Sequence, residues 1–299
     1  MDKVNTRVFL SVAETGSFNE TARLLGYSQA GVSYIISAME EELGLKLFSR
    51  EYGGVRLTGD GTLLLPYIRQ INSGERQLEA KVSDLKGLRS GHLRIIVFDS
   101  VSVNWVPCIL REFKKDFPGV EVELISEEDT RRAEEMVYRQ EADCGFFLHS
   151  PLQLELYCLP LMEEALQAVV SVDHPLASLP FFPLSALGEY PYISMAFEDN
   201  NGISDIFRSH GVTPKIAYRM DNDYAAMAMA GNGLGFCIFP ELLLQNSPYP
   251  IRRLDFEEPQ SRIVSIATRS LKSCSLAARK FIEYTDRFAR EYREKNGSL

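Results

Sequence analysis

The side chains best suited to metal or nucleophilic chemistry are scattered along this sequence. No C-x-x-C pair and no G-x-S-x-G, H-E-x-x-H or Walker pattern occurs, so a zinc site and hydrolase chemistry are both disfavoured. Isolated cysteines are typical of reduced, mostly buried thiols. We therefore predict no metal and no cofactor, and the residues concerned are His92, His149, His174, His210, Cys108, Cys144, Cys158, Cys237 and Cys274.

Two further signals of bound-ligand or redox chemistry are also weak. The run Gly231–Gly235 resembles part of a dinucleotide fingerprint, but it follows a predicted helix (223–230) and leads into a strand, the reverse of that motif. We interpret it as a helix C-cap and turn. Redox sensing needs a reactive thiol and usually a resolving partner. It is disfavoured because Cys144 falls in a predicted core strand.

Small polar side chains between residues 28 and 37 suit the recognition of bases. Gln29 can pair two-pronged with adenine, Ser33 and Tyr34 can reach base edges or phosphates, and the small residues between them allow close approach. Two arginines further on suit phosphates or a minor groove. The predicted DNA-contacting residues are Ser28, Gln29, Ala30, Gly31, Ser33, Tyr34, Ser37, Arg50 and Arg56.

Short helices and a hairpin must position these side chains. Apolar spacing predicts helices over 5–13, 20–25 (capped by Asn19) and 29–43 (capped by Ser28), then a β-hairpin from 46–50 and 55–57. Ala22, Leu25, Val32 and Ile36 would pack the second helix against the third. This is the helix-turn-helix pattern, whose second helix lies in the major groove. A small helical bundle is the alternative.

A long helix over 58–88 follows the hairpin. Its apolar residues recur at alternating four- and three-residue steps with one polar intrusion, as in a coiled-coil seam, at Leu64, Ile68, Ile71, Glu75, Leu78, Val82 and Leu85. The seam is narrow and the other faces are polar. Dimerisation is therefore favoured over packing on the chain's own domain.

Strands and helices alternate through the rest of the chain. We predict strands at 92–98, 120–125, 144–148, 168–170, 192–194, 216–218, 236–239 and 263–268, and helices at 106–116, 131–140 and 275–294. Such alternation predicts a parallel, doubly wound α/β sheet, here in two lobes behind a helical head.

Charge is distributed unevenly between these parts. Residues 1–90 hold 11 basic and 11 acidic side chains, so the whole net charge of −9 lies in residues 91–299. A net charge of −9 argues against nonspecific coating of nucleic acid and against attraction to an anionic membrane. No apolar run approaches the roughly 18 residues of a membrane span, and the start lacks a signal-peptide core. The sequence therefore predicts a soluble, cytoplasmic protein.

The N-terminal residues resemble the LysR-type transcriptional regulators. The likeness is continuous over about 4–66 and is carried by the runs Phe9–Phe18, Thr21–Leu25, Ser28–Ser33, Met39–Arg50 and Val55–Thr58. It implies a winged helix-turn-helix (1–60), a linker helix for dimerisation (61–90) and a periplasmic-binding-protein-like effector domain (91–299). Lobe I would comprise about 91–162 and 267–299, and lobe II about 163–266. Members of the family are often tetrameric.

Several residues depart from the family pattern. Ala30 stands where proline is usual, and Gly31 after it should loosen the start of the third helix. Tyr34 replaces a common charged or imidazole side chain, and Glu51 lies where family wings tend to be basic. We therefore expect DNA binding that depends on hydrogen bonds and paired half-sites more than on bulk charge.

Candidate effector residues lie where doubly wound sheets bind ligands, at the carboxyl ends of strands. Ser100 and Ser102 can cap a helix there or bind a ligand, and both alternatives stay open. The resemblance implies an effector site at Asp99, Ser100, Val101, Ser102, Asp129, Thr130, Phe197, Asn200, Asn201, Gly202 and Asn222.

The loops around this predicted cleft are rich in acidic residues. The residues that follow the third strand, Phe146–Leu148, offer no arginine of the kind that some carboxylate-binding relatives use. One hypothesis is an effector that carries an amine and is not a strong dianion; the alternative is that the carboxylates simply face solvent. The acids are Asp99, Glu127, Glu128, Asp129, Glu198, Asp199, Asp221 and Asp223.

Together these features predict a dimeric or tetrameric regulator, not an enzyme, that binds double-stranded DNA and a small-molecule effector. Effector binding between the lobes would change the placement of the paired heads. The alternative from another class is a transport-like or enzymatic small-molecule-binding protein whose head only mediates assembly.

Overall fold

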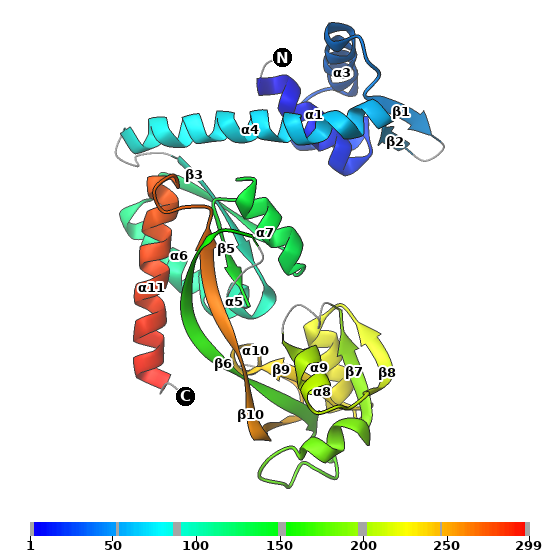
Figure 1. Cartoon of the computed structure of the whole chain (residues 1–299), viewed down its shortest axis with the longest axis vertical. Coiled ribbons are helices and arrows are strands. Elements are labelled where there is room, and N and C mark those ends of the chain that lie inside the picture. The colour runs from blue at the N-terminus through cyan, green and yellow to red at the C-terminus, as the bar shows by residue number, and fades with distance from the viewer. Residues whose placement is uncertain are drawn as a thin grey trace. The chain divides into compact units, whose positions relative to one another are not determined.

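The computed structural model describes residues 3–51, 54–85, 91–148, 154–196, 202–245 and 247–296, with only the backbone of Lys3, Arg50, Glu51 and Asn296. The chain divides into two compact units, Met1–Leu85 and Lys86–Leu299 (Figure 1). We call them the head and the C-terminal unit. Among the described helices, not one combines the length and apolar character that a bilayer crossing requires.

Three helices build the head: α1 (Lys3–Thr15), α2 (Phe18–Leu25) and α3 (Gln29–Leu43). Their bounds lie within two residues of those predicted, and α3 matches at both ends. The predicted cap of α2 is wrong: Ser17, not Asn19, caps it, because the Ser17 hydroxyl accepts a hydrogen bond from the amide of Glu20 at 3.2 Å. The core of the head comprises Val8, Phe9, Val12, Ala22, Val32, Ile36, Met39, Leu47 and Ile68.

The predicted hairpin is confirmed as a two-stranded wing. Strand β1 (Phe48–Glu51) pairs antiparallel with β2 (Gly54–Leu57). The amide of Val55 donates to the carbonyl of Gly16 at 2.8 Å, so the wing is fixed to the turn between α1 and α2. A Cβ on Gly54 would lie 2.8 Å from that same carbonyl oxygen. Only glycine therefore allows this close approach.

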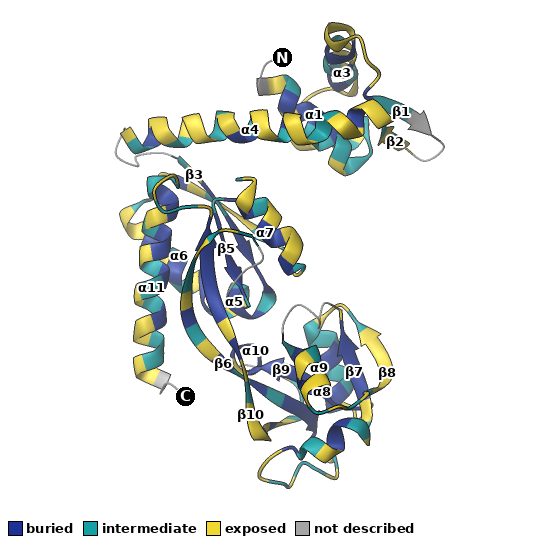
Figure 2. Cartoon of the chain, in the orientation of Figure 1, coloured by how far each residue is buried: buried dark blue, intermediate teal, exposed yellow. Residues whose placement is uncertain are grey.

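The predicted seam lies along helix α4 (Gly59–Leu85), and it has a buried part and an exposed part. Ile68 is buried in the head's core and Leu64 packs against it, so the seam's beginning belongs to the chain's own domain. The Glu75 carboxylate accepts a hydrogen bond from Thr6 Oγ1 at 3.3 Å. The later apolar positions are exposed, and Figure 2 shows exposed residues along most of α4.

The first part of the C-terminal unit alternates strands and helices as predicted, with one extra helix, α5. Its elements are β3 (Gly91–Val97), α5 (Asp99–Asn104), α6 (Val106–Asp116), β4 (Val120–Ser126), α7 (Thr130–Tyr138), β5 (Cys144–Phe147) and β6 (Tyr157–Ser171).

The second part adds shorter elements and then a long return strand and helix. They are η1 (Leu184–Gly188), β7 (Pro191–Met195), α8 (Ile203–Ser209), β8 (Lys215–Met220), α9 (Asp223–Gly231), β9 (Cys237–Pro240), α10 (Glu241–Leu244), β10 (Ile251–Thr268) and α11 (Leu276–Asn296).

The prediction of a purely parallel sheet is wrong. The main sheet has the order β4-β3-β5-β10-β6-β9; β3 is parallel to β4 and β5, but β10 is antiparallel to β5 and β6, and β9 to β6. A separate parallel pair joins β7 and β8. The apolar signal covers only one end of β6 and one end of β10, 168–170 and 263–268, whereas both strands are far longer. Their long antiparallel pairing is therefore not visible in the sequence pattern.

Two long strands connect two hydrophobic cores. We call the parts of the C-terminal unit around these cores lobe I and lobe II. Leu161 of β6 and Val264 of β10 lie in the lobe I core around Trp105. Leu166 of β6 and Leu254 of β10 lie in the lobe II core. The strands therefore pass from one lobe to the other, as Figure 1 shows.

Candidate functional site

One side of α3 is buried and the other is open. Val32, Ile36 and Met39 lie in the head's core, at most 3% exposed. Tyr34 is 75% exposed. The exposed predicted DNA-contacting residues along this edge are Ser28, Gln29, Ala30, Tyr34 and Ser37, while Gly31 and Ser33 are half-buried.

The start of α3 is held by a side-chain cap. The Ser28 hydroxyl accepts a hydrogen bond from the amide of Gly31 at 3.0 Å, as predicted for the N-cap. A Cβ at position 31 would approach that hydroxyl oxygen to 3.2 Å, so the glycine gives the cap its room. Because its hydroxyl is engaged in the cap, Ser28 has one lone pair and its proton left for an outside partner.

The wing presents Arg56 on β2, where its side chain is exposed. Arg50 lies on β1 opposite Val55 in the strand register, and its side chain is outside the described part of the structure. In an antiparallel pair, alternate side chains project to opposite faces.

A buried carboxylate anchors the far end of α3 to the wing. Glu40 accepts hydrogen bonds from the amides of Leu47 at 2.9 Å and Phe48 at 3.2 Å, and from Lys46 Nζ at 2.5 Å. Burial opposes ionisation of Glu40, but the Lys46 ammonium and the two amides outweigh it and lower its pKa. The acid therefore has its partners inside the head and is not available to repel DNA.

Exposed apolar side chains continue along α4 beyond the head's core. Ile71 is 42% exposed, Leu78 67%, Val82 42% and Leu85 79%. These four keep the spacing of the predicted seam. Apolar side chains in such a row usually have a partner surface.

In the C-terminal unit, the carboxyl ends of β3 and β4 meet at one edge. Val97 and Ser126 are register partners, so the residues that follow them are neighbours. The amide of Asp99 donates to Glu128 Oε1 at 3.2 Å, which joins the two segments. The sheet thus brings Asp99 and Ser100 to the place where a doubly wound sheet binds ligands.

The capping role considered for Ser100 and Ser102 is wrong. The N-cap residues of α5 and α6 are Phe98 and Trp105, and neither makes a side-chain capping hydrogen bond. Ser102 Oγ donates to the carbonyl of Asp99 at 2.9 Å, within the helix's own first turn. Ser100 Oγ instead accepts from Arg262 Nη2 at 3.1 Å. Val101 is fully buried in the lobe I core, so its side chain is not open to a ligand.

Arg262 and Glu164 form a buried ion pair at the same edge. They face each other across β10 and β6, and Arg262 Nε lies 2.9 Å from Glu164 Oε2, with 5% and 1% of the side chains exposed. Glu164 Oε1 also accepts from the amide of Leu242 at 3.1 Å. The guanidinium lies over the Phe98 ring, 5.7 Å from its centroid. Since its charge is paired internally, Arg262 is not a free receptor for an anion.

Three carboxylates lie near this ion pair. Asp99 and Glu128 come from lobe I, and Asp223 begins α9, which packs in lobe II. Desolvation, then the charge of Asp99, raises the pKa of Glu128 to about 7, although the residue as a whole is exposed. The same two causes raise the pKa of Asp223 to about 6, against the opposing charge of Arg262. We call Asp99, Ser100, Glu128, Glu164, Asp223 and Arg262 the interlobe cluster.

The other predicted effector residues are mostly helix caps. Asp129 Oδ1 accepts from the amide of Arg131 at 3.0 Å, and Asn222 Oδ1 accepts from the amide of Ala225 at 2.8 Å. Thr130 begins α7 and is 8% exposed, and Gly202 precedes α8 in the left-handed region at φ 84°. Those outside the described residues are Phe197, Asn200 and Asn201, together with the acids Glu198 and Asp199.

Not every predicted acid joins the cluster. Glu127 Oε2 lies 3.0 Å from Arg132 Nε and its other oxygen accepts from the amide of Asp129 at 3.0 Å. Asp221 is exposed. The alternative of ordinary solvated acids therefore fits Asp221, but it does not fit Asp223, which is half-buried.

Arg262 and Glu164 were missed by the sequence analysis. Both lie in strands whose polar halves were not predicted. The available signal was weak: each residue directly precedes two apolar residues that can continue a strand, in Glu164-Ala165-Leu166 and Arg262-Ile263-Val264.

The glycine run and the buried Cys144, which the sequence disfavours as functional signals, have structural roles. The Gly231–Gly235 run is the end of α9 and a turn, with Gly233 at φ 75°, leading into β9 as interpreted. Cys144 is fully buried, and burial raises the pKa of its thiol well above its ordinary value. All five cysteines are free thiols. Within the described ranges, no three histidine, cysteine, aspartate or glutamate side chains are placed to hold a metal ion.

Family models match both units of the chain. Residues 5–62 match the bacterial regulatory helix-turn-helix protein of the lysR family, and residues 86–289 match the LysR substrate binding domain. The chain is 33% identical over 280 residues to the uncharacterized HTH-type transcriptional regulator YvbU of Bacillus subtilis, covering 93% of this chain and 95% of that protein. It is 30% identical over 274 residues to the probable regulator LrrA of Synechococcus elongatus, covering 89% and 90%.

Solved structures share the fold. CbnR, a LysR family transcriptional regulator, aligns with a TM-score of 0.72 at 22% identity, over 97% of this chain and 99% of that one. Full-length BenM aligns with a TM-score of 0.61 at 22% identity, over 100% and 99%. The two family models together cover most of the chain. It therefore belongs to the LysR family of transcriptional regulators, in which a helix-turn-helix that binds DNA is joined to an effector-binding domain.

Proposed function

We propose that α3 reads base edges in a major groove while the wing contacts the backbone. The observation that carries this is the exposed edge of α3, opposite a face held in the head's core by Val32, Ile36 and Met39. Gln29, at the capped start of the helix, is the proposed adenine reader. The remaining proposed contacts are Ser28, Ala30, Gly31, Ser33, Tyr34, Ser37, Arg50 and Arg56.

A mobility-shift titration with DNA from upstream of the protein's own coding region tests this assignment. Gln29→Ala and Ser33→Ala should each weaken specific binding by about 1–3 kcal/mol, the usual worth of a base contact. Gln70→Ala makes the same change as Gln29→Ala at an exposed position of α4 and should leave the affinity unchanged. Full-strength specific binding by both α3 variants would show that another element reads the bases.

We infer that two copies pair through the exposed part of the α4 seam, and that dimers associate further into tetramers. The support is the row of exposed apolar side chains at Ile71, Leu78, Val82 and Leu85. Leu78→Glu would place a charge in that seam. Light scattering should then give a smaller mass than for the wild type, and DNA affinity should fall because two linked heads bind more tightly than one. A monomeric wild type that still binds DNA would contradict the pairing.

We propose further that a small-molecule effector binds beside the interlobe cluster. The cluster joins side chains from both lobes, so a ligand there can favour one arrangement of the lobes over another. The proposed contacts are the predicted effector residues other than the buried Val101, and the proposed domains are 1–60, 61–90 and 91–299. Ser100→Ala should lower the affinity for the effector and leave DNA binding without effector intact.

The chemistry of the cluster disfavours a strongly dianionic effector. Arg262 is paired with Glu164, and Asp99, Glu128 and Asp223 would repel added negative charge. An effector carrying an amine is therefore the better candidate. Calorimetric screening tests this, since tight binding of a dicarboxylate or a phosphate ester at this site would contradict it.

We infer a regulator that works in the cytoplasm and is not an enzyme, because its family consists of regulators and its proposed partner is DNA. The competing function is a transport-like or enzymatic binding protein with an assembly head. That function predicts ligand binding without any preference among DNA sequences, so the mobility-shift experiment separates the two.

A further inference from the structure

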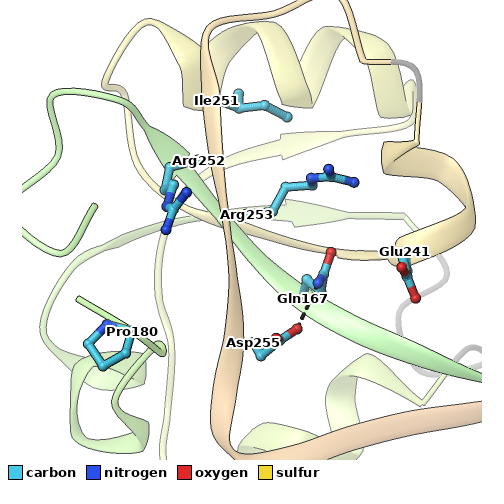
Figure 3. Close-up of a pocket in the computed structure, with 7 residues that line it drawn as sticks. All are labelled: Gln167, Pro180, Glu241, Ile251, Arg252, Arg253 and Asp255. Atoms are coloured by element: carbon cyan, nitrogen blue, oxygen red, sulfur yellow. Dashed lines mark hydrogen bonds between the residues drawn. The ribbon is translucent and has the colours of Figure 1, made fainter. Parts of the chain in front are cut away.

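A polar pocket lies in the C-terminal unit, apart from the interlobe cluster. It has a volume of about 420 Å³, and none of its lining residues belongs to the cluster. It is formed by β6, β10, the start of α10 and the segment before Phe182 (Figure 3). The volume is at the small end of the range for ligand sites, which suits a molecule of few atoms.

The lining of this pocket carries balanced opposite charges. Arg252 and Arg253 supply two positive charges, and Asp255 and Glu241 supply two negative ones. Ile251 and Pro180 complete the wall. A strongly charged ligand of either sign would meet repulsion from one pair, and an apolar ligand would find little surface to cover.

The charged groups of the pocket are not satisfied by one another. No ion pair joins Arg252, Arg253 or Glu241 to another described residue, and Arg253 Nη1 reaches only the carbonyl of Leu244, at 3.4 Å. In Figure 3 Arg253 extends to the side of β10 where Glu241 lies, and Arg252 extends to the other side. The guanidinium donors thus remain open to an acceptor from outside.

A fixed amide orients one carboxylate of the pocket. Gln167 Nε2 donates to Asp255 Oδ1 at 2.7 Å, which orients the amide. Its oxygen then points away from Asp255, on the side of Arg253 (Figure 3), and this buried atom has no hydrogen-bond partner among the described residues. Because that oxygen is buried, the contribution of Gln167 to the pocket is to hold the Asp255 carboxylate in place.

We propose that this pocket binds a small zwitterion of the α-amino-acid class. A guanidinium fork is the matched receptor for the ligand's carboxylate. The ammonium group then donates to the carboxylates of Asp255 and Glu241, which both line the pocket. The site also contacts α10, where the amide of Leu242 donates to Glu164 and Asn104 Nδ2 donates to the Leu242 carbonyl at 2.9 Å.

Titration calorimetry of the full-length protein tests the proposal, with glycine, L-serine and L-glutamine as separate probes. At least one should bind, whereas its N-acetyl derivative and its methyl ester, which lack the ammonium and the carboxylate charge respectively, should bind about tenfold more weakly or not at all. Glucose tests a neutral polyol and should not bind. Failure of all three amino acids, or equal binding of the derivatives, would overturn the proposal.

Variants locate the site. Arg253→Gln and Asp255→Asn should each weaken amino-acid binding about tenfold, because each removes one charged partner. Arg219→Gln changes an exposed arginine of β8 and should have no effect. Ser100→Ala, in the interlobe cluster, should also have no effect. If Ser100→Ala abolishes binding while Arg253→Gln does not, the amino acid binds at the cluster and the proposed pocket is wrong.

Discussion

Crowded carboxylates serve opposite purposes in the two units. In the head, Glu40 has two backbone amides and the Lys46 ammonium as partners, and its pKa is lowered. In the C-terminal unit, Asp223 and Glu128 lie near another acid, and their pKa values are raised. An acid with a cationic partner fixes a rigid support, whereas acids near a like charge store repulsion that a ligand or a proton can relieve.

The largest expected loss of stability comes from replacing Arg262. Its positive charge also opposes the rise in the pKa values of Asp223 and Glu128. Arg262→Ala leaves Glu164 buried without its ion pair and should destabilise the C-terminal unit by about 3–5 kcal/mol. The only tryptophan, Trp105, is fully buried in the lobe I core, so its fluorescence during urea unfolding reports on this unit.

A double variant provides the control for that prediction. Arg262→Leu with Glu164→Leu leaves no buried charge and should be less destabilised than Arg262→Ala. If the single variant proves as stable as the wild type, the ion pair is not what maintains this edge of the sheet.

Glu40→Ala should destabilise the head by about 2–3 kcal/mol, since it leaves the amides of Leu47 and Phe48 without an acceptor. Because the pKa of Glu40 is lowered, its contribution is present above the ordinary carboxyl pKa and is lost as pH falls through the lowered value. Hydrogen exchange of these two amides is the measurement. The neighbouring Glu41→Ala, at an exposed position, should leave their protection unchanged.

Asp223→Asn should show the opposite pH dependence and the smallest effect. The raised pKa means that the folded protein binds the proton more tightly than the unfolded chain. Stability of the wild type relative to the variant should therefore decline as pH rises from about 4 through about 6. Solvent screening limits the change to about 1 kcal/mol. Urea unfolding followed by Trp105 fluorescence at pH 4 and pH 8 measures it, and a wild type that gains stability relative to the variant as pH rises would contradict the raised pKa.

The head could be predicted from sequence more completely than the C-terminal unit. Local signals determine it: Ser28 caps α3, Gly26 ends α2 at φ 71°, and apolar spacing defines the buried faces. Among the three helices of the head, the cap of α2 is the feature predicted at the wrong residue. Along α4, spacing alone could not show that Ile68 belongs to the head's own core while Leu78 stays exposed.

The interlobe cluster depends on contacts between residues far apart in the chain. Arg262 meets Glu164 only because β10 and β6 run antiparallel past both lobes. Sequence patterns near either residue contain no information about that pairing. The acids were noticed, but only the fold distinguishes Glu128, beside Asp99, from Glu127, which is paired with Arg132.

Base-specific recognition by Gln29 tests the central claim most directly. Affinities of the wild type and Gln29→Ala are measured by fluorescence anisotropy on a bound DNA site and on copies in which each adenine is replaced in turn. The wild type should lose about 1–3 kcal/mol at one adenine in each half-site, and Gln29→Ala should bind the original and the replaced sites equally. If the variant discriminates at every adenine as strongly as the wild type does, α3 does not read the DNA as described.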